Sequence, residues 1–116
     1  MSERPCPFCG IAAGEVAADL VHQGSRVVAF ADLHPQAPHH LLVIPREHIP
    51  TLNHLGPAHN DLVGEMFQVA QALARERGFA DSGYRTVFNC NPEAGQSVYH
   101  VHLHVLGGRP MAWPPG

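Results

Sequence analysis

Three histidines alternate with aliphatic residues in the stretch YHVHLHVL at positions 99–106. Strict alternation is typical of a half-buried β-strand, whose successive side chains point to opposite faces of a sheet. The pattern predicts that His100, His102 and His104 share one face, while the core takes the intervening aliphatic residues, Val101, Leu103 and Val105. Imidazole can bind a metal, carry a proton or attack phosphorus, so the polar face is a candidate reaction surface.

The geometry of a strand argues against a single metal ion bound by all three imidazoles. The Cα atoms of His100 and His104 would lie about 13 Å apart, whereas a zinc–nitrogen bond is about 2.0 Å long. A metal has other ligands available, because Cys6 and Cys9 have the CxxC spacing that brings two thiolates to one tetrahedral ion. His48 and one histidine of the triad would complete a structural zinc site. A redox pair and inert thiols are the alternatives for the two cysteines.

If His100 binds the metal, His102 stands in the middle of the open face with a free side chain. A neutral imidazole attacks phosphorus when a hydrogen bond from its second nitrogen to a carbonyl fixes the tautomer. The Ser97 hydroxyl could protonate a leaving amine or oxygen. His40 could polarise the phosphate, with His104 holding the neighbouring geometry. A structural role is the alternative for each histidine taken singly.

The composition limits the possible partners. A net charge of −3 gives no basic patch for a nucleic-acid backbone, and we expect no nucleic acid as partner. The chain has no lysine, which excludes Schiff-base and P-loop chemistry. No apolar run approaches the ~20 residues of a membrane span, and the N-terminus has no signal-peptide pattern. With three cysteines, an odd number, we expect a cytoplasmic protein without a disulfide framework.

The elements that must position these residues can be traced along one domain of 116 residues. A short helix is expected within 6–15, and a long one from Pro57 to Gly78 with an apolar stripe at Leu62, Met66, Val69, Ala70 and Leu73. Strands are expected at 20–22, 26–30, 41–45, 84–89 and 98–106. This pattern predicts an α+β fold with a five-stranded antiparallel sheet covered on one face.

The sequence GQSVYHVHLHVLGGR, with AFADLHPQAPHHLLVIPREHI upstream and the terminal WPPG, resembles the histidine triad family. The likeness is to the branch of nucleotide-binding purine nucleoside phosphoramidases, and it covers nearly the whole chain. It implies a histidine triad fold and a homodimer in which two sheets join into one. It also implies hydrolysis of adenosine or guanosine phosphoramidates.

The resemblance assigns roles to individual residues. It makes His102 the nucleophile that takes up the nucleoside monophosphate, and Ser97 the group that protonates the leaving amine. Asp32 and Leu33 would contact the ribose and the base, and the tail with Trp113 would reach the site of the partner subunit. The remaining residues expected around the phosphate and ribose are Asn89, Gly95, Gln96, His40 and His104.

The resemblance also matches Cys6, Cys9, His48 and His100 to the structural zinc site of bacterial relatives and of uridylyltransferases. Three functions follow as alternatives. The first is a phosphoramidase with a nucleotidyl-His102 intermediate, which Ser97 and the tail favour. The second is a dinucleoside polyphosphate hydrolase or nucleotidyl transferase with the same nucleophile. The third is a zinc-stabilised nucleotide-binding or partner-binding module with little turnover.

Overall fold

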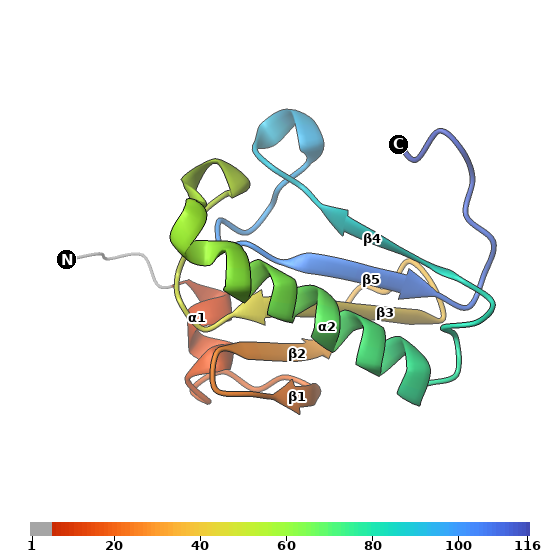
Figure 1. The fold of residues 1–116 in the computed structure, drawn as a ribbon, viewed down its shortest axis with the longest axis horizontal. Helices are drawn as coiled ribbons and strands as arrows, with labels where there is room; N and C mark the ends of the chain where they lie inside the picture. Colours follow the sequence, from red (N-terminus) through yellow and green to blue (C-terminus); the bar gives the residue numbers. More distant parts are fainter. Residues whose placement is uncertain (1–5) are drawn as a thin grey trace.

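A five-stranded antiparallel sheet forms the centre of the molecule, as the sequence predicts (Figure 1). The computed structural model describes residues 6–116. The strands run in the order β1-β2-β3-β5-β4, so β1 and β4 are the two edges. Their bounds are Leu20–Gln23 for β1, Val27–Ala31 for β2, His39–Pro45 for β3, Tyr84–Phe88 for β4 and Leu103–Gly107 for β5.

The long helix α2, Asn60–Glu76, lies across one face of the sheet (Figure 1). It starts later than the predicted Pro57, because residues 57–59 form a 3₁₀ turn before it. Gly78 follows its end with a φ of 83°, a left-handed conformation that glycine adopts without strain. The predicted apolar stripe is buried against the sheet throughout. Within the described part of the chain, none of the helices has the length and hydropathy to cross a bilayer.

The alternation around the histidine triad is confirmed on the core side. Val101, Leu103 and Val105 are at most 3% exposed and pack in the cluster beneath α2. The opposite face of the sheet carries a second, smaller apolar cluster, which the sequence did not predict. The short helix α1, Pro7–Ala12, contributes Phe8 and Ile11 to it. Helix α1 therefore covers part of the sheet face that carries the histidines.

The strand predicted at 98–106 is shorter than expected: β5 begins only at Leu103 and ends at Gly107. Pro45 of β3 has no N–H to donate, and its carbonyl accepts a hydrogen bond from His100 Nε2 at 2.8 Å. The Val101 N–H donates to Ile49 O at 2.7 Å, beyond the end of β3. The first two histidines of the triad thus lie in an irregular segment, with bends at residues 98–100, that leads into the strand.

Candidate active site and metal centre

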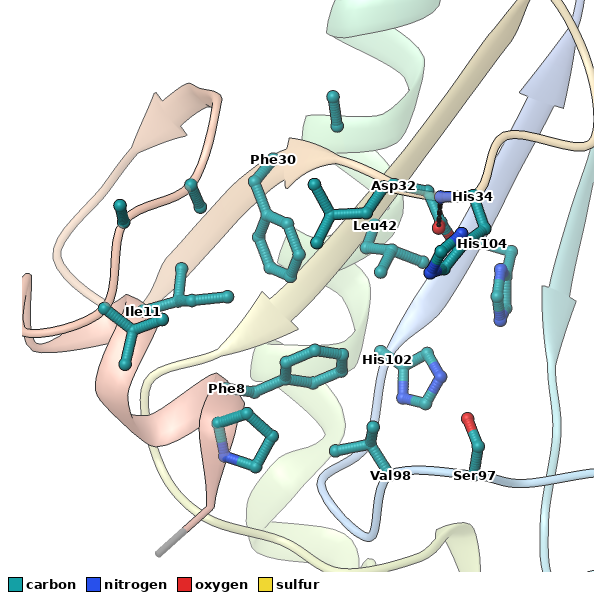
Figure 2. A pocket seen from close by; sticks show the side chains of 16 residues that line it. Phe8, Ile11, Phe30, Asp32, His34, Leu42, Ser97, Val98, His102 and His104 are labelled. Atoms are coloured by element: carbon teal, nitrogen blue, oxygen red, sulfur yellow. Dashed lines mark hydrogen bonds between the residues drawn. The ribbon is translucent and has the colours of Figure 1, made fainter.

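A cavity of about 370 Å³ opens on the face of the sheet opposite α2 (Figure 2). Its apolar wall includes Phe8 and Ile11 of α1 together with Phe30 and Leu42 of the sheet. The cavity is also lined by predicted site residues, namely Asp32, Leu33, Ser97, His102 and His104. A cavity of this size, mostly apolar with a few convergent polar groups, is typical of a small-molecule site.

His102 is held in one tautomer by the main chain. Its Nδ1 lies 2.8 Å from the carbonyl oxygen of His100. A carbonyl only accepts, so Nδ1 carries the hydrogen and Nε2 keeps a lone pair. The Phe8 ring packs edge-on against the imidazole, with centroids 5.1 Å apart and planes at 85°. His102 is therefore a buried, oriented imidazole whose Nε2 carries a lone pair in the neutral ring.

His40 and His104 form a hydrogen-bonded chain whose direction is set by one backbone amide. The Gln36 N–H donates to His40 Nδ1 at 3.0 Å, so the proton of a neutral His40 is on Nε2. That Nε2–H donates to His104 Nδ1 at 2.9 Å, which leaves the proton of His104 on its own Nε2. The Nε2–H of His104 is thus a hydrogen-bond donor, whereas Nε2 of His102 is an acceptor.

Burial keeps both members of this chain neutral. It lowers the pKa of His40, although the Asp32 carboxylate, 3.3 Å away, opposes the shift. Burial lowers the pKa of His104 to about 4, and the neighbouring imidazoles of His102 and His40 act in the same direction. Asp32, His40 and His104 lie close enough to share a metal ion. The proton on His40 Nε2 nevertheless favours the hydrogen-bonded chain over a metal site.

Four potential metal ligands converge at the N-terminal end of α1, with their ligand atoms all within 4.8 Å of one another. They are Cys6, Cys9, His48 and His100. The Sγ atoms of Cys6 and Cys9 lie 3.3 and 3.6 Å from His100 Nδ1. His48 Nδ1 lies 3.3 Å both from Cys9 Sγ and from His100 Nδ1. Four donors at zinc bond lengths stand about 3.3 to 3.8 Å apart in a tetrahedron, so these spacings fit the ion.

The chemistry of the donors also fits a metal. His100 Nε2–H donates to the Pro45 carbonyl, which turns the Nδ1 lone pair toward the cysteines. Burial and the neighbouring Cys6 thiol raise the pKa of Cys9 to about 11. Ionisation of this thiol at neutral pH therefore requires a cation beside it. A redox pair or inert thiols would give no reason for two imidazoles to converge on the same sulfur atoms.

Gln96, expected at the phosphate, holds the preceding loop together. Its side chain is buried, and its amide group donates to the carbonyls of Pro50 and Val98 at 2.8 and 3.1 Å. Its Oε1 accepts from the Asn91 N–H at 2.8 Å. With these three bonds Gln96 fixes the segment that presents Ser97 to the cavity.

The other predicted residues lie around the cavity without lining it. Asn89 borders a separate open hollow, which it shares with Trp113 of the C-terminal tail. Gly95 is exposed, and its φ of 83° lets the loop turn before Ser97. His40 lies behind His104 and reaches the cavity only through it. The lining of the cavity thus does not include Asn89, Gly95 or His40.

Two functional features were missed by the sequence analysis. Phe8 and Ile11 form the wall contributed by α1, and their spacing around the CxxC pair is the signal that could have found them. When Cys6 and Cys9 face one side of a single helical turn, the residues between and after them face the other. The bond from Gln36 to His40 has no sequence signal, because it uses a backbone N–H.

This chain is similar to a known family model, to curated proteins and to solved structures. Residues 5–112 match the family model described as "Scavenger mRNA decapping enzyme C-term binding". The purine nucleoside phosphoramidase of Escherichia coli is 45% identical over 90% of this chain and 87% of its own length. A 14 kDa zinc-binding protein of Zea mays is 40% identical over 100% of this chain and 91% of its own length. The crystal structure of a HIT family hydrolase from Legionella pneumophila superposes with a TM-score of 0.95 at 48% sequence identity. The match covers 97% of this chain and 100% of that one.

Proposed function

The chain belongs to the histidine triad family of hydrolases, and we propose that it cleaves the P–N bond of purine nucleoside phosphoramidates. The reaction proceeds through a covalent nucleotidyl-His102 intermediate. The single observation that carries the proposal is the fixed tautomer of His102, which leaves a lone pair on Nε2 in a nucleotide-sized cavity. The name of the relative from Escherichia coli supports the choice of substrate.

In the first step, the lone pair of His102 Nε2 forms a bond to phosphorus as the P–N bond breaks. The electron pair of that bond leaves with the amine nitrogen, which takes a proton from the Ser97 hydroxyl. The Ser97 hydroxyl lies beside His102 in the cavity lining (Figure 2). The Nε2–H of His104 faces the same cavity and can donate to a phosphoryl oxygen as charge develops on it.

In the second step, water attacks phosphorus and the bond to His102 Nε2 breaks, which restores the lone pair. The proton of the water returns to Ser97. The net reaction consumes one water and releases the amine and the nucleoside monophosphate.

The cavity lining supports a purine nucleoside as the group transferred. Phe8 and Ile11 offer an apolar wall against which a base can pack, and Leu33 is 86% exposed at the rim. The Asp32 carboxylate can accept hydrogen bonds from ribose hydroxyls, although its Oδ1 already accepts from the His34 N–H at 2.8 Å. We propose Asp32 and Leu33 as the contacts for ribose and base.

The ion proposed for the cluster of Cys6, Cys9, His48 and His100 is zinc, in a structural role. All four donors are side chains of the protein, which is typical of structural rather than catalytic zinc. The donor spacings support it, as does the similarity to a zinc-binding protein of Zea mays. Zinc would join α1 to the segments that follow β3 and precede β5.

A homodimer in the cytoplasm completes the proposal. The edge strand β4 is only half-buried along its whole length, and beside it Phe67 is 41% exposed while its ring contacts Phe88. An open edge next to an exposed aromatic side chain suits pairing with a second copy. Trp113 is 83% exposed on a tail that is held by a bond from Arg85 to Ala112 O. Such a tail could reach a partner subunit.

The proposal is tested by mass spectrometry of protein quenched after mixing with an adenosine phosphoramidate. We expect an adduct with the mass of one adenylyl group, mapped to His102, and release of the amine. A His102→Ala variant, checked for folding by circular dichroism, should form no adduct and lose turnover. Turnover retained in that variant would refute the nucleophile.

Rates with different leaving groups, measured together with adduct formation, separate the alternatives. A dinucleoside polyphosphate hydrolase would react faster when pyrophosphate or a nucleotide is the leaving group than when an amine leaves. A binding module would bind adenosine monophosphate and form no adduct. Faster reaction with amine leaving groups is the result expected here.

A further inference from the structure

Helix α1 contributes residues both to the metal cluster and to the nucleotide cavity. Cys6 caps the helix, and its Sγ accepts from the Cys9 N–H at 3.4 Å, so both sulfur atoms face the cluster. Phe8 and Ile11, on the same six-residue helix, face the cavity (Figure 2). A displacement of α1 would therefore change the metal ligands and the cavity wall together.

His100 connects the two sites by a second route. Its side chain reaches the cluster through Nδ1, while its main-chain carbonyl accepts the hydrogen bond that fixes the tautomer of His102. The Phe8 ring lies between these residues, with its centroid 5.9 Å from that of His100 and 5.1 Å from that of His102. The side chain of one residue binds the metal, and its backbone orients the nucleophile.

A helix as short as α1 depends on such contacts for its position. Isolated helices below about 12 residues are marginal in water, and α1 has six. Its other anchors are the burial of Phe8 and Ile11 and one bond from the Arg46 guanidinium to Ala12 O. Four metal–ligand bonds would add the strongest restraint on the position of α1, because they would tie Cys6 and Cys9 to His48 and His100. Occupancy of the cluster must then shift the population in which the cavity wall is in place.

We propose that a metal ion in the cluster of Cys6, Cys9, His48 and His100 and a purine nucleotide in the cavity raise each other's affinity through α1 and His100. The inference rests on the proposed function, since it requires both ligands. Linkage demands the same factor in both directions, and couplings of this kind typically lie between about 5-fold and 150-fold. With two routes joining adjacent sites, we expect a factor of about ten.

The test measures binding and not turnover. The affinity for zinc is determined by competition with a chromophoric chelator, with and without saturating adenosine monophosphate. The affinity for adenosine monophosphate is determined by calorimetry on zinc-loaded and zinc-free protein. We expect about a tenfold gain in each direction, with the two factors equal within error.

A pair of matched variants tests the route. Phe8→Leu removes the ring that packs on His100 and His102, whereas Phe79→Leu removes another buried ring, from the core beneath α2. We expect the coupling factor to fall toward one in Phe8→Leu, whatever change the substitution makes to either affinity alone. Phe79→Leu should keep the factor. If coupling only reflected global unfolding of the zinc-free protein, both variants would change it alike.

Each outcome decides between the proposals. Equal zinc affinity with and without adenosine monophosphate overturns the coupling and leaves the proposed function standing. No binding of adenosine monophosphate to zinc-loaded protein overturns both, and no binding of zinc overturns the metal assignment together with the coupling. An unchanged factor in Phe8→Leu overturns the route through α1.

Discussion

Acid should destabilise the protein through His104, and the size of the effect follows from its surroundings. Burial and the nearby imidazoles of His102 and His40 lower the pKa of His104 from 6.5 to about 4. Below pH 6.5 the unfolded chain binds the proton and the folded chain does not. The free energy of unfolding therefore falls as the pH drops from 6.5 toward 4 and levels off below it.

The full pKa difference corresponds to about 3 kcal/mol, which the partial exposure of the His104 ring reduces to about 1 to 2 kcal/mol. A His104→Asn variant isolates this contribution. The Asn side chain can still accept from His40 Nε2–H, and it does not titrate. The variant should thus lose about 1 to 2 kcal/mol less than the wild type when the pH is lowered from 7 to 4.5.

The assay is urea denaturation followed by circular dichroism at both pH values. Acid also protonates the metal ligands, but this loss is common to both proteins and cancels in the difference between them. Equal pH dependence of the unfolding free energy in wild type and variant would show that His104 is not held neutral by burial. The hydrogen-bonded chain through His40 would then have to be reassigned.

Three further predictions concern the leaving group, the metal and the second subunit. Ser97→Ala should slow cleavage of strongly basic amines by about 100-fold or more and that of weakly basic amines far less, because only the former need the proton; equal slowing in a series of amines would exclude this role. Cys6→Ser should reduce zinc content, measured by elemental analysis, from about one ion per chain to near zero, whereas Cys90→Ser, outside the cluster, should leave it unchanged. Phe67→Glu should weaken self-association by at least about tenfold in analytical ultracentrifugation, since it places a charge at the proposed interface.

The sequence predicted the elements whose signal is local. The apolar stripe of α2 and the alternation around the triad each arise from one segment facing one core, so periodicity alone was sufficient. The start of β5 could not be predicted in the same way. It depends on Pro45, which lies on another strand and cannot donate to a further ladder bond. Alternating sequence before Leu103 looks identical whether or not a partner strand is available.

Residue type predicts which side chains can gather at the candidate site, whereas packing decides which contacts each of them makes. The convergence of Cys6 and Cys9 with two histidines follows from the restricted ligand preferences of a metal. The resemblance places Gln96 at the phosphate and ribose pocket, and in the structure its side chain bonds to backbone groups of its own loop and of Pro50. A versatile side chain near a site has several uses, and only tertiary structure selects among them.

The use of a main-chain carbonyl to orient His102 has a consequence for the evolution and engineering of this site. A carboxylate partner could be lost by one substitution, whereas the carbonyl of residue 100 persists whatever side chain is there. The side chain at position 100, a proposed metal ligand, can therefore change without directly deleting the bond that fixes the tautomer of His102. What a substitution at His100 would change is the placement of that carbonyl, which the cluster and the bond to Pro45 now hold. A metal in the cluster would therefore act on His102 by holding this carbonyl in place.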